Sequence, residues 1–311
     1  MWPVSFKPPA LAGIAIQPET IHLVQLKKAR KGYLLERVRR YALEKNIFSE
    51  GKISAFAELK KQLADMVKRE GLRGVCAAVC VPASQVNMQR MTLPKGLSAQ
   101  DIEAEISVYV QRSLPVKAEN MAMDYRLSDA GQPQEIDVFF AAARKDYIDN
   151  FQSCLCAAGL QVKMIDVDIF ALLRAARYAL YDELPKNEAI GVLYVGADYA
   201  VIAAQRDKEI LFHRQWHGKT APHAQTRQQW LEWCCHTWQH INIDVVAIGG
   251  YHKFVNEAAA VMAAKWRSKI FEPDPFMKMM GASGADKAVM HDSPSAFLLA
   301  CGLAMRDVRP W

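Results

Sequence analysis

Thiol and imidazole side chains gather in one short stretch of the sequence, where they could bind a metal ion. Residues 234–236 read Cys-Cys-His, and His240 follows four residues after the first histidine, so both imidazoles would share one face of a helix. Cys234, however, continues an apolar stripe with Trp230 and Trp238, and no second cysteine pair has the spacing of a zinc site. We therefore expect a buried thiol beside a solvated histidine face, and no metal centre.

Two further patterns that could support phosphate binding or nucleophilic catalysis are incomplete. Residues 281–287 read Gly-Ala-Ser-Gly-Ala-Asp-Lys, which lacks the Gly-Lys-Ser/Thr ending of a phosphate loop and follows no apolar strand. The sequence contains no Gly-x-Ser-x-Gly elbow for a serine nucleophile. Cys154 and Cys156 are two residues apart in a helical pattern, so their thiols should point to different sides. We expect a surface loop at 281–287 and no covalent catalysis.

The composition is that of a folded protein with one large or two medium-sized domains. Of the 311 residues, 51% are apolar and 23% are charged, which excludes a disordered or linker-dominated chain. The longest uncharged apolar run, residues 293–305, has 13 residues, and about 20 are needed to span a bilayer. The seven cysteines lie mostly within apolar patterns, as reduced thiols do. We expect a cytoplasmic protein.

The strand and helix patterns repeat once along the chain. The first series of three strands, a helix and a strand lies at 12–16, 20–26, 33–41, 54–70 and 75–81. The second series, about 180 residues later, lies at 190–197, 200–206, 209–216, 226–240 and 245–248. Two similar α/β halves that face one another would leave a cleft between them, which is the usual place for a ligand.

A compact block of α+β character separates the two halves. It contains a strand at 88–93, a helix whose start is marked by a capping box of Ser98 and Asp101, two strands around a turn at 131–133, and a second helix that ends at Gly159. The predicted domains are therefore residues 1–85 for the first half, 86–160 for the insertion and 161–311 for the second half. We expect the C-terminal helix, residues 295–308, to pack back onto the first half.

Short motifs in a fixed order resemble those of the PilM family, the actin-like proteins of type IV pilus assembly. Residues 13–24 read Gly-Ile-Ala-Ile-Gln-Pro-Glu-Thr-Ile-His-Leu-Val, where that family usually has Gly-Ile-Asp-Ile-Gly-Ser-Ser-Ser-Val-Lys-Leu-Val. Further matches follow in order at 93–94, 114–115, 123–125, 141–144, 158–160, 165–168, 195–197, 248–250 and 300–306. The resemblance implies an actin-like α/β fold, with duplicated ribonuclease-H-like halves and an α+β insertion like that of the cell-division protein FtsA.

The phosphate loops depart from the pattern of actin-like ATPases, which hold Mg-ATP between two Asp-x-Gly loops. Ala15 and Tyr194 stand where the two carboxylates are expected, and Pro18 lacks a backbone N–H donor. The positions that the resemblance assigns to this degenerate nucleotide site are Gly13, Gln17, Gly196, Gly249 and Gly250. The resemblance also implies that about 30 residues of the family pattern are missing between the third and the last strand of the second half, so we expect a reduced helical lobe. We expect Mg-ATP binding to be weak or absent, with no catalytic residues and no required cofactor.

The resemblance implies a non-catalytic adaptor of a type IV pilus, or of a related competence or secretion system, at the cytoplasmic face of the inner membrane. PilM-family proteins hold the N-terminal cytoplasmic segment of a single-pass membrane partner, PilN, in a groove beside the insertion. Candidate pocket residues here are Ile106, Tyr109, Val110, Leu114 and Tyr125. These side chains could equally form the core of the insertion. The alternative function is an actin-like ATP-binding switch whose nucleotide state controls partner binding.

A cluster of basic residues lies at the turn between the second and third strands. Residues 27–31 read Lys-Lys-Ala-Arg-Lys, and Arg37, Arg39 and Arg40 follow. This cluster could face anionic lipid or could be a solvated turn. The 39 basic and 33 acidic residues give a net charge of only +6, without interleaved aromatic residues, so we expect no nucleic acid partner. Self-association of the chain is left open.

Overall fold

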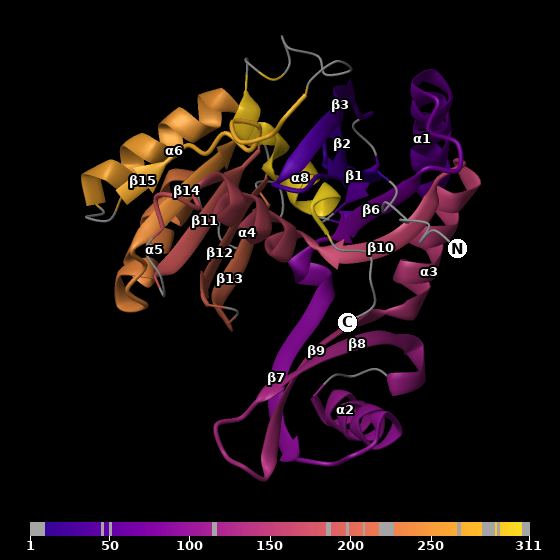
Figure 1. The fold of residues 1–311 in the computed structure, drawn as a ribbon, viewed down its shortest axis with the longest axis vertical. Coiled ribbons are helices and arrows are strands. Elements are labelled where there is room, and N and C mark those ends of the chain that lie inside the picture. Colours follow the sequence, from indigo (N-terminus) through magenta and orange to yellow (C-terminus); the bar gives the residue numbers. More distant parts are fainter. Residues whose placement is uncertain are drawn as a thin grey trace.

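The computed structural model describes residues 10–306, with gaps at 45–46, 50–51, 114–116, 185–187, 197–198, 208, 218–226, 266–268, 282–289 and 291–292. Figure 1 shows two α/β lobes side by side, with a smaller subdomain that extends away from their junction. No helix among the described residues is long and apolar enough to cross a membrane.

The first lobe is a five-stranded sheet whose strand order is β10-β6-β1-β2-β3. Its strands and helices are β1 (Leu11–Ile16), β2 (Thr20–Lys28), β3 (Tyr33–Ala42), α1 (Phe56–Glu70), β6 (Cys76–Val81), α3 (Lys145–Ala157) and β10 (Gln161–Val167), with a short hairpin of β4 (Phe48–Ser49) and β5 (Lys52–Ile53). Every residue of β2 from Ile21 to Val24 is buried, because one face of the sheet meets α1 and α3 and the other meets the helices that lie between the two lobes.

The second lobe repeats this arrangement, which confirms the predicted duplication. Its elements are β11 (Ala189–Val195), β12 (Tyr199–Arg206), β13 (Glu209–His217), α5 (Arg227–His240), β14 (Val245–Gly250), α6 (His252–Lys265) and β15 (Lys269–Phe271). The strand order β15-β14-β11-β12-β13 matches that of the first lobe position by position. In both lobes an antiparallel three-stranded meander continues into strands that run parallel to its first strand.

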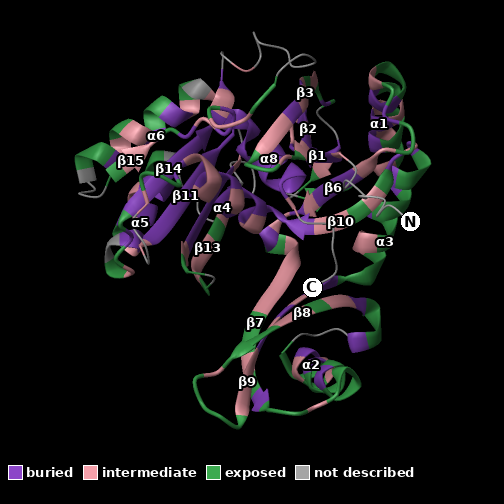
Figure 2. Cartoon of the chain, viewed as in Figure 1, coloured by how far each residue is buried: buried purple, intermediate pink, exposed green. Residues whose placement is uncertain are grey.

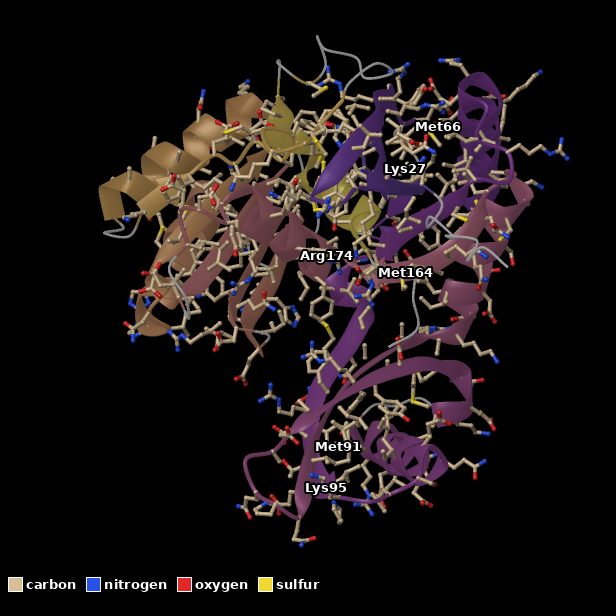
Figure 3. All side chains as sticks on the ribbon, viewed as in Figure 1. Lys27, Met66, Met91, Lys95, Met164 and Arg174 are labelled. Atoms are coloured by element: carbon tan, nitrogen blue, oxygen red, sulfur yellow. The ribbon has the colours of Figure 1, made fainter. Side chains whose placement is uncertain are left out.

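The insertion is a three-stranded antiparallel sheet, β7-β9-β8, with one helix on one face (Figure 1). It consists of η1 (Ala83–Gln85), β7 (Val86–Pro94), α2 (Ala99–Ser113), η2 (Ala118–Asn120), β8 (Met121–Asp129) and β9 (Glu135–Arg144). The predicted capping box is present, because Asp101 N–H donates to Ser98 Oγ at 3.2 Å and Ser98 N–H donates to Asp101 Oδ2 at 3.2 Å. Met91 and Lys95 mark this subdomain in Figure 3.

The structure places the domain boundaries differently from the predicted 86–160 and 161–311. β10 pairs in parallel with β6 and so belongs to the sheet of the first lobe. Phe151 and Leu155 of α3 are buried against α1 in the core of that lobe. The insertion proper therefore ends near Arg144, and the chain returns to the first lobe through α3 and β10. Composition along the chain cannot reveal this, because strand pairing is a long-range property.

Two helices from distant parts of the chain form the buried layer between the two sheets. These are α4 (Asp168–Ala179) and α8 (Leu298–Ala304), the latter preceded by η3 (Pro294–Phe297). α8 packs on β1 and β2, and a Cβ atom at Gly13 would lie 2.0 Å from the carbonyl oxygen of Ala300. A Cβ atom at Gly302 would lie 1.8 Å from the carbonyl oxygen of Ala171. All residues of α8 and most residues of α4 are buried, and Figure 2 shows the two helices between the sheets.

Candidate functional site

The carboxyl ends of β1, β11 and β14 meet at the junction of the lobes and form the interlobe crevice. The side-chain oxygen of Gln17, which follows β1, lies 3.4 Å from the hydroxyl of Tyr194 on β11. Tyr194 pairs with Gly249 in the parallel ladder, and the next residue pairs with Gly250. Gly196 follows directly after β11. The structure thus brings four of the five predicted nucleotide-site residues together.

Gly13, the fifth predicted residue, lies within β1 and does not face the crevice. Its Cα approaches α8, where a Cβ would also lie 2.5 Å from the amide nitrogen of Ala304. A glycine is required here because the helix backbone packs directly on the strand. Gly13 therefore has a packing role in this chain.

Protein side chains fill the crevice in which the resemblance would place phosphates. Tyr194 is fully buried, and its hydroxyl donates a hydrogen bond to the carbonyl oxygen of Ala296 at 2.6 Å. Thr20 Oγ1 and the hydroxyl of Tyr251 are 2.6 Å apart, so a hydrogen bond joins the first lobe to the second. The ring of Phe297 lies 4.6 Å from that of His22.

The crevice glycines approach protein atoms closely. A Cβ at Gly196 would lie 2.2 Å from the ring of Tyr199, and a Cβ at Gly249 would lie 2.3 Å from the side chain of Leu298. Gly250 adopts φ +127°, and a Cβ there would lie 2.1 Å from the carbonyl oxygen of Val195. In this structure these glycines make room for tyrosine, leucine and backbone.

The groups that stand in place of the expected carboxylates carry no charge. Ala15 is buried where the resemblance expects a carboxylate, and burial raises the pKa of Tyr194, which keeps this hydroxyl neutral. His22 is also fully buried, and burial, with a smaller contribution from the charge of Arg40, lowers its pKa to about 3. Neither ring nitrogen of His22 has a hydrogen-bond partner among the described residues. Ala15, Tyr194 and His22 supply no carboxylate, which is the kind of ligand that magnesium prefers.

Two carboxylates lie nearby, at the end of β10 and at the start of α4, but both are engaged in structural contacts. Asp166 forms an ion pair with Arg174 at 2.9 Å, and Arg174 lies where the lobes and the insertion meet (Figure 3). Asp168 accepts hydrogen bonds from the N–H of Ala83 at 3.0 Å and from Gln215 Nε2 at 2.5 Å. Burial raises the pKa of Asp168 to about 7, although these donors oppose the shift. Asp168 thereby connects the first turn of the insertion to the second lobe.

The residues that were predicted to bind a partner lie in the insertion, and two of them are in its core. Ile106 and Val110 are each 1% exposed, between α2 and the sheet. Tyr109 is half-buried, with its ring 5.5 Å from that of Phe140, and Tyr125 is half-buried on β8. Leu114 lies outside the described residues.

Helical spacing identified the apolar face of α2, but that face is covered by the insertion's own sheet. Among the described residues of this subdomain, the exposed large apolar side chains are Val108, on the outer face of α2, and Leu127, on β8, which are 42% and 48% exposed. β8 is also an edge strand, so one side of its backbone is not paired with β9. Sequence reasoning missed the edge, because the order β7-β9-β8 was not predictable from the chain.

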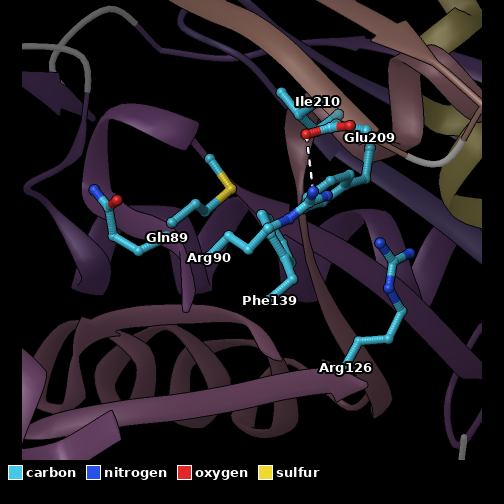
Figure 4. A pocket seen from close by; sticks show the side chains of 8 residues that line it. Gln89, Arg90, Arg126, Phe139, Glu209 and Ile210 are labelled. Carbon is cyan, nitrogen blue, oxygen red and sulfur yellow. Dashed lines mark ion pairs between the residues drawn. The ribbon is translucent and has the colours of Figure 1, made fainter. Parts of the chain in front are cut away.

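A pocket of about 180 Å³ lies between the insertion and the second lobe (Figure 4). Arg90 on β7 crosses it to form an ion pair with Glu209 on β13 at 2.9 Å. The residues that line the pocket are Met88, Gln89, Arg90, Arg126, Phe139, Phe170, Glu209 and Ile210. The volume is that of one or two side chains, so we regard it as part of the joint between insertion and lobe. Side chains alternate between the two faces of β7 and β9, and Met88 and Phe139 lie on the face that points away from α2. This alternation in the sequence could have predicted a second contact face of the insertion.

The described part of α5 does not assemble a metal site. Cys234 and Cys235 are buried, whereas His236 and His240 are exposed, with ring centroids 4.7 Å apart. No group of three potential metal ligands occurs among the residues that the structure describes. Residues 282–287 of the predicted surface loop lie outside the described residues, and Gly281 before them is exposed.

Two lobes with the same strand order, a helix layer between them and an insertion after the first crossover define an actin-like α/β protein. A model of the family described as type IV pilus assembly protein PilM matches residues 13–230, and the chain belongs to this family.

Solved structures agree with this assignment of the fold. A chain of the PilM-PilN type IV pilus biogenesis complex superposes with a TM-score of 0.77 at 17% identity, over 96% of this chain and 99% of that chain. The ethanolamine utilization protein EutJ from Carboxydothermus hydrogenoformans superposes with a TM-score of 0.50 at 10% identity, over 96% and 90% of the two chains. The near-complete coverage includes the insertion in both comparisons.

Proposed function

We propose that this chain is a non-catalytic adaptor in type IV pilus assembly, which binds the N-terminal cytoplasmic segment of a PilN-like inner-membrane protein. Family membership and the similarity to the solved PilM-PilN complex support the partner. The observation that carries the non-catalytic part is the position of Tyr194. A buried tyrosine that donates to the carbonyl of Ala296 occupies the point where an ATPase needs a carboxylate for its metal.

The filled crevice also opposes the motion that a nucleotide switch requires. The hydrogen bond between Thr20 and Tyr251 already joins the lobes, and Tyr194 packs under η3. Nucleotide would have to displace these groups before its phosphates could approach the backbone, and a ligand shifts a conformational equilibrium only by its differential affinity for the two states. The adaptor would therefore act by binding the partner segment alone, without a nucleotide-driven movement of the lobes, which are already in contact.

The open edge of β8 is the part of the insertion best suited to an extended peptide. An added strand could pair with the unpaired backbone of β8, while its side chains contact Tyr109, Tyr125 and the exposed Leu127. The predicted residues Ile106 and Val110 would then act from beneath, by holding α2 on the sheet. In this arrangement, backbone hydrogen bonds supply affinity and the tyrosines supply specificity.

Titration of the full chain with a synthetic N-terminal segment of the PilN-like protein tests this site. Leu127→Glu places a charge beside the β8 edge and should weaken binding at least tenfold, which corresponds to about 1.4 kcal/mol. Val108→Glu makes the same type of change at a similarly exposed residue on the far face of α2, and it should leave the affinity unchanged. Equal affinity of all three proteins would refute the β8 site, and absence of binding by the wild type would refute the proposed partner.

Thermal unfolding with and without excess Mg-ATP tests the non-catalytic part against the alternative of an ATP-binding switch. A ligand at a hundred times its Kd adds about 2.7 kcal/mol of stability, which would raise the Tm of a chain of this size by several degrees. We expect no shift. A clear shift would favour the switch, for which the retained pair Gly249 and Gly250 is the supporting feature.

A further inference from the structure

Three of the five exposed large apolar side chains among the described residues lie on one small surface. Tyr181 and Met277 are each 75% exposed, and Met280 is 52% exposed. The other two, Val108 and Leu127, belong to the insertion. Single exposed apolar residues are common on proteins, but a cluster of long apolar side chains that are mostly exposed to solvent indicates a contact surface.

Three separate segments are fixed together to form this surface. The N–H of Met280 donates to the carbonyl of Tyr33 at 3.0 Å, and the N–H of Leu35 donates to the carbonyl of Met280 at 2.8 Å, so the segment containing Met277 and Met280 is held on β3. The hydroxyl of Tyr178, near the end of α4, donates to the carbonyl of Lys278 at 3.3 Å. The surface is therefore built on the structured part of the chain.

Basic side chains surround the exposed apolar ones. Lys28, Arg30 and Lys31 are exposed at the β2–β3 turn, where a Cβ atom at Gly32 would lie 3.2 Å from the Tyr178 hydroxyl. Lys278 lies over the ring of Tyr181 at 6.0 Å and forms an ion pair with Asp182 at 2.7 Å.

Two of the arginines that sequence analysis grouped with this turn lie elsewhere. Arg37 and Arg39 form ion pairs with Glu70 at the end of α1, at 3.7 and 3.4 Å. The basic character of the surface therefore comes mainly from the turn itself, because Lys278 is paired with Asp182.

We propose that this surface, which we call the hairpin patch (Lys28, Arg30, Lys31, Tyr181, Met277, Lys278 and Met280), docks directly on an anionic lipid bilayer. Cationic groups around exposed apolar side chains match the chemistry of a headgroup region over acyl chains, where each lysine or arginine near the surface strengthens partitioning about fivefold. A second copy of the patch is a poorer occupant, because like charges would face each other. The contact does not depend on the peptide site of the adaptor and would add to it.

Vesicle co-sedimentation of the purified full chain tests the proposal without any protein partner. The probes are extruded vesicles of phosphatidylcholine with one quarter phosphatidylglycerol, and vesicles of phosphatidylcholine alone, each at 50 and 300 mM salt. We expect binding to the anionic vesicles that weakens at the higher salt concentration, because the Debye length shortens. Failure of the wild type to bind anionic vesicles at 50 mM salt would overturn the proposal.

Matched charge reversals locate the contact on the chain. Lys28→Glu with Arg30→Glu and Lys31→Glu should reduce vesicle binding about a hundredfold. Reversal of three exposed lysines of α1, at positions 60, 61 and 68, changes the net charge equally and should have a much smaller effect. An equal loss in both triple variants would mean that net charge alone drives binding, and this would overturn the patch.

Substitution of the two methionines tests the apolar part of the contact. Met277→Ser with Met280→Ser keeps every charge and should weaken binding at least tenfold, and unchanged binding would overturn the apolar contribution that the proposal includes. Sedimentation of the chain without vesicles tests the second copy as occupant, and a dimer that the methionine substitutions abolish would also overturn the proposal. Titration with the PilN-like segment distinguishes the two sites, because all patch variants should keep wild-type affinity for it.

Discussion

Acidification should unfold this protein in part through a single histidine, His22, which β2 places in the interlobe crevice. The imidazole is fully buried, with the ring of Phe297 4.6 Å away and the ring of Tyr251 6.2 Å away. Burial lowers its pKa from 6.5 to about 3. The folded state therefore binds the proton less tightly than the unfolded state, so protons favour unfolding.

The size of the effect follows from the two pKa values. The contribution of neutral His22 to stability is complete above pH 6.5 and is lost as the pH falls from 6.5 toward 3. Each pH unit within this range costs about 1.4 kcal/mol, so the loss between pH 8 and pH 5 is about 2 kcal/mol. This is a large part of the ~5–15 kcal/mol that stabilises a typical protein.

Urea unfolding at several pH values between 8 and 5 measures the loss when wild type and variants are compared. His22→Leu cannot take up a proton, so its stability should fall by about 2 kcal/mol less than that of the wild type over this range. His236→Gln removes an exposed imidazole and should keep the wild-type pH dependence. Parallel curves for wild type and His22→Leu would refute the reasoning, because they would mean that His22 is protonated at no cost or that the crevice opens first.

Three further predictions concern packing, hydrogen bonding and thiol chemistry. Gly302→Ala should destabilise the chain by about 3 kcal/mol or more in urea unfolding, because the new methyl group would meet a backbone carbonyl of α4 at 1.8 Å. Tyr194→Phe leaves a buried carbonyl of η3 without its donor and should cost about 1–3 kcal/mol by the same measurement, so a neutral substitution would contradict the 2.6 Å hydrogen bond. A maleimide should modify the exposed Cys156 quickly and Cys154 slowly, since burial raises the pKa of the Cys154 thiol to about 11; mass spectrometry of the labelled peptides decides the order.

Local patterns along the chain were sufficient to predict the strands, the main helices and their duplication. Alternation and apolar runs placed β1, β2 and β3 to within two or three residues, and the same pattern recurred at β11, β12 and β13. The position of β10 could not be predicted in this way, because its pairing with β6 joins segments about 85 residues apart. Its residues Gln161–Val167 were assigned to the wrong lobe for that reason.

The candidate site was predictable in its residue types but not in its geometry. The sequence shows that Tyr194 stands where the family has Asp, and this predicts a weak metal site. That the hydroxyl reaches the carbonyl of Ala296, about 100 residues away, requires the folded chain. Helical spacing likewise identified Ile106 and Val110 as apolar, but burial by their own sheet depends on which strands pair, and so does the open edge of β8.

The packing of α8 between the lobes has a consequence for how the protein matures on the ribosome. β1 and β2 are synthesised well before residues 298–304, which cover one apolar side of their sheet. The first lobe therefore cannot complete its core until α8 has been synthesised, and the nascent chain carries an uncovered apolar surface up to that point. We expect holding chaperones to protect this intermediate, and a chain truncated before residue 298 to aggregate.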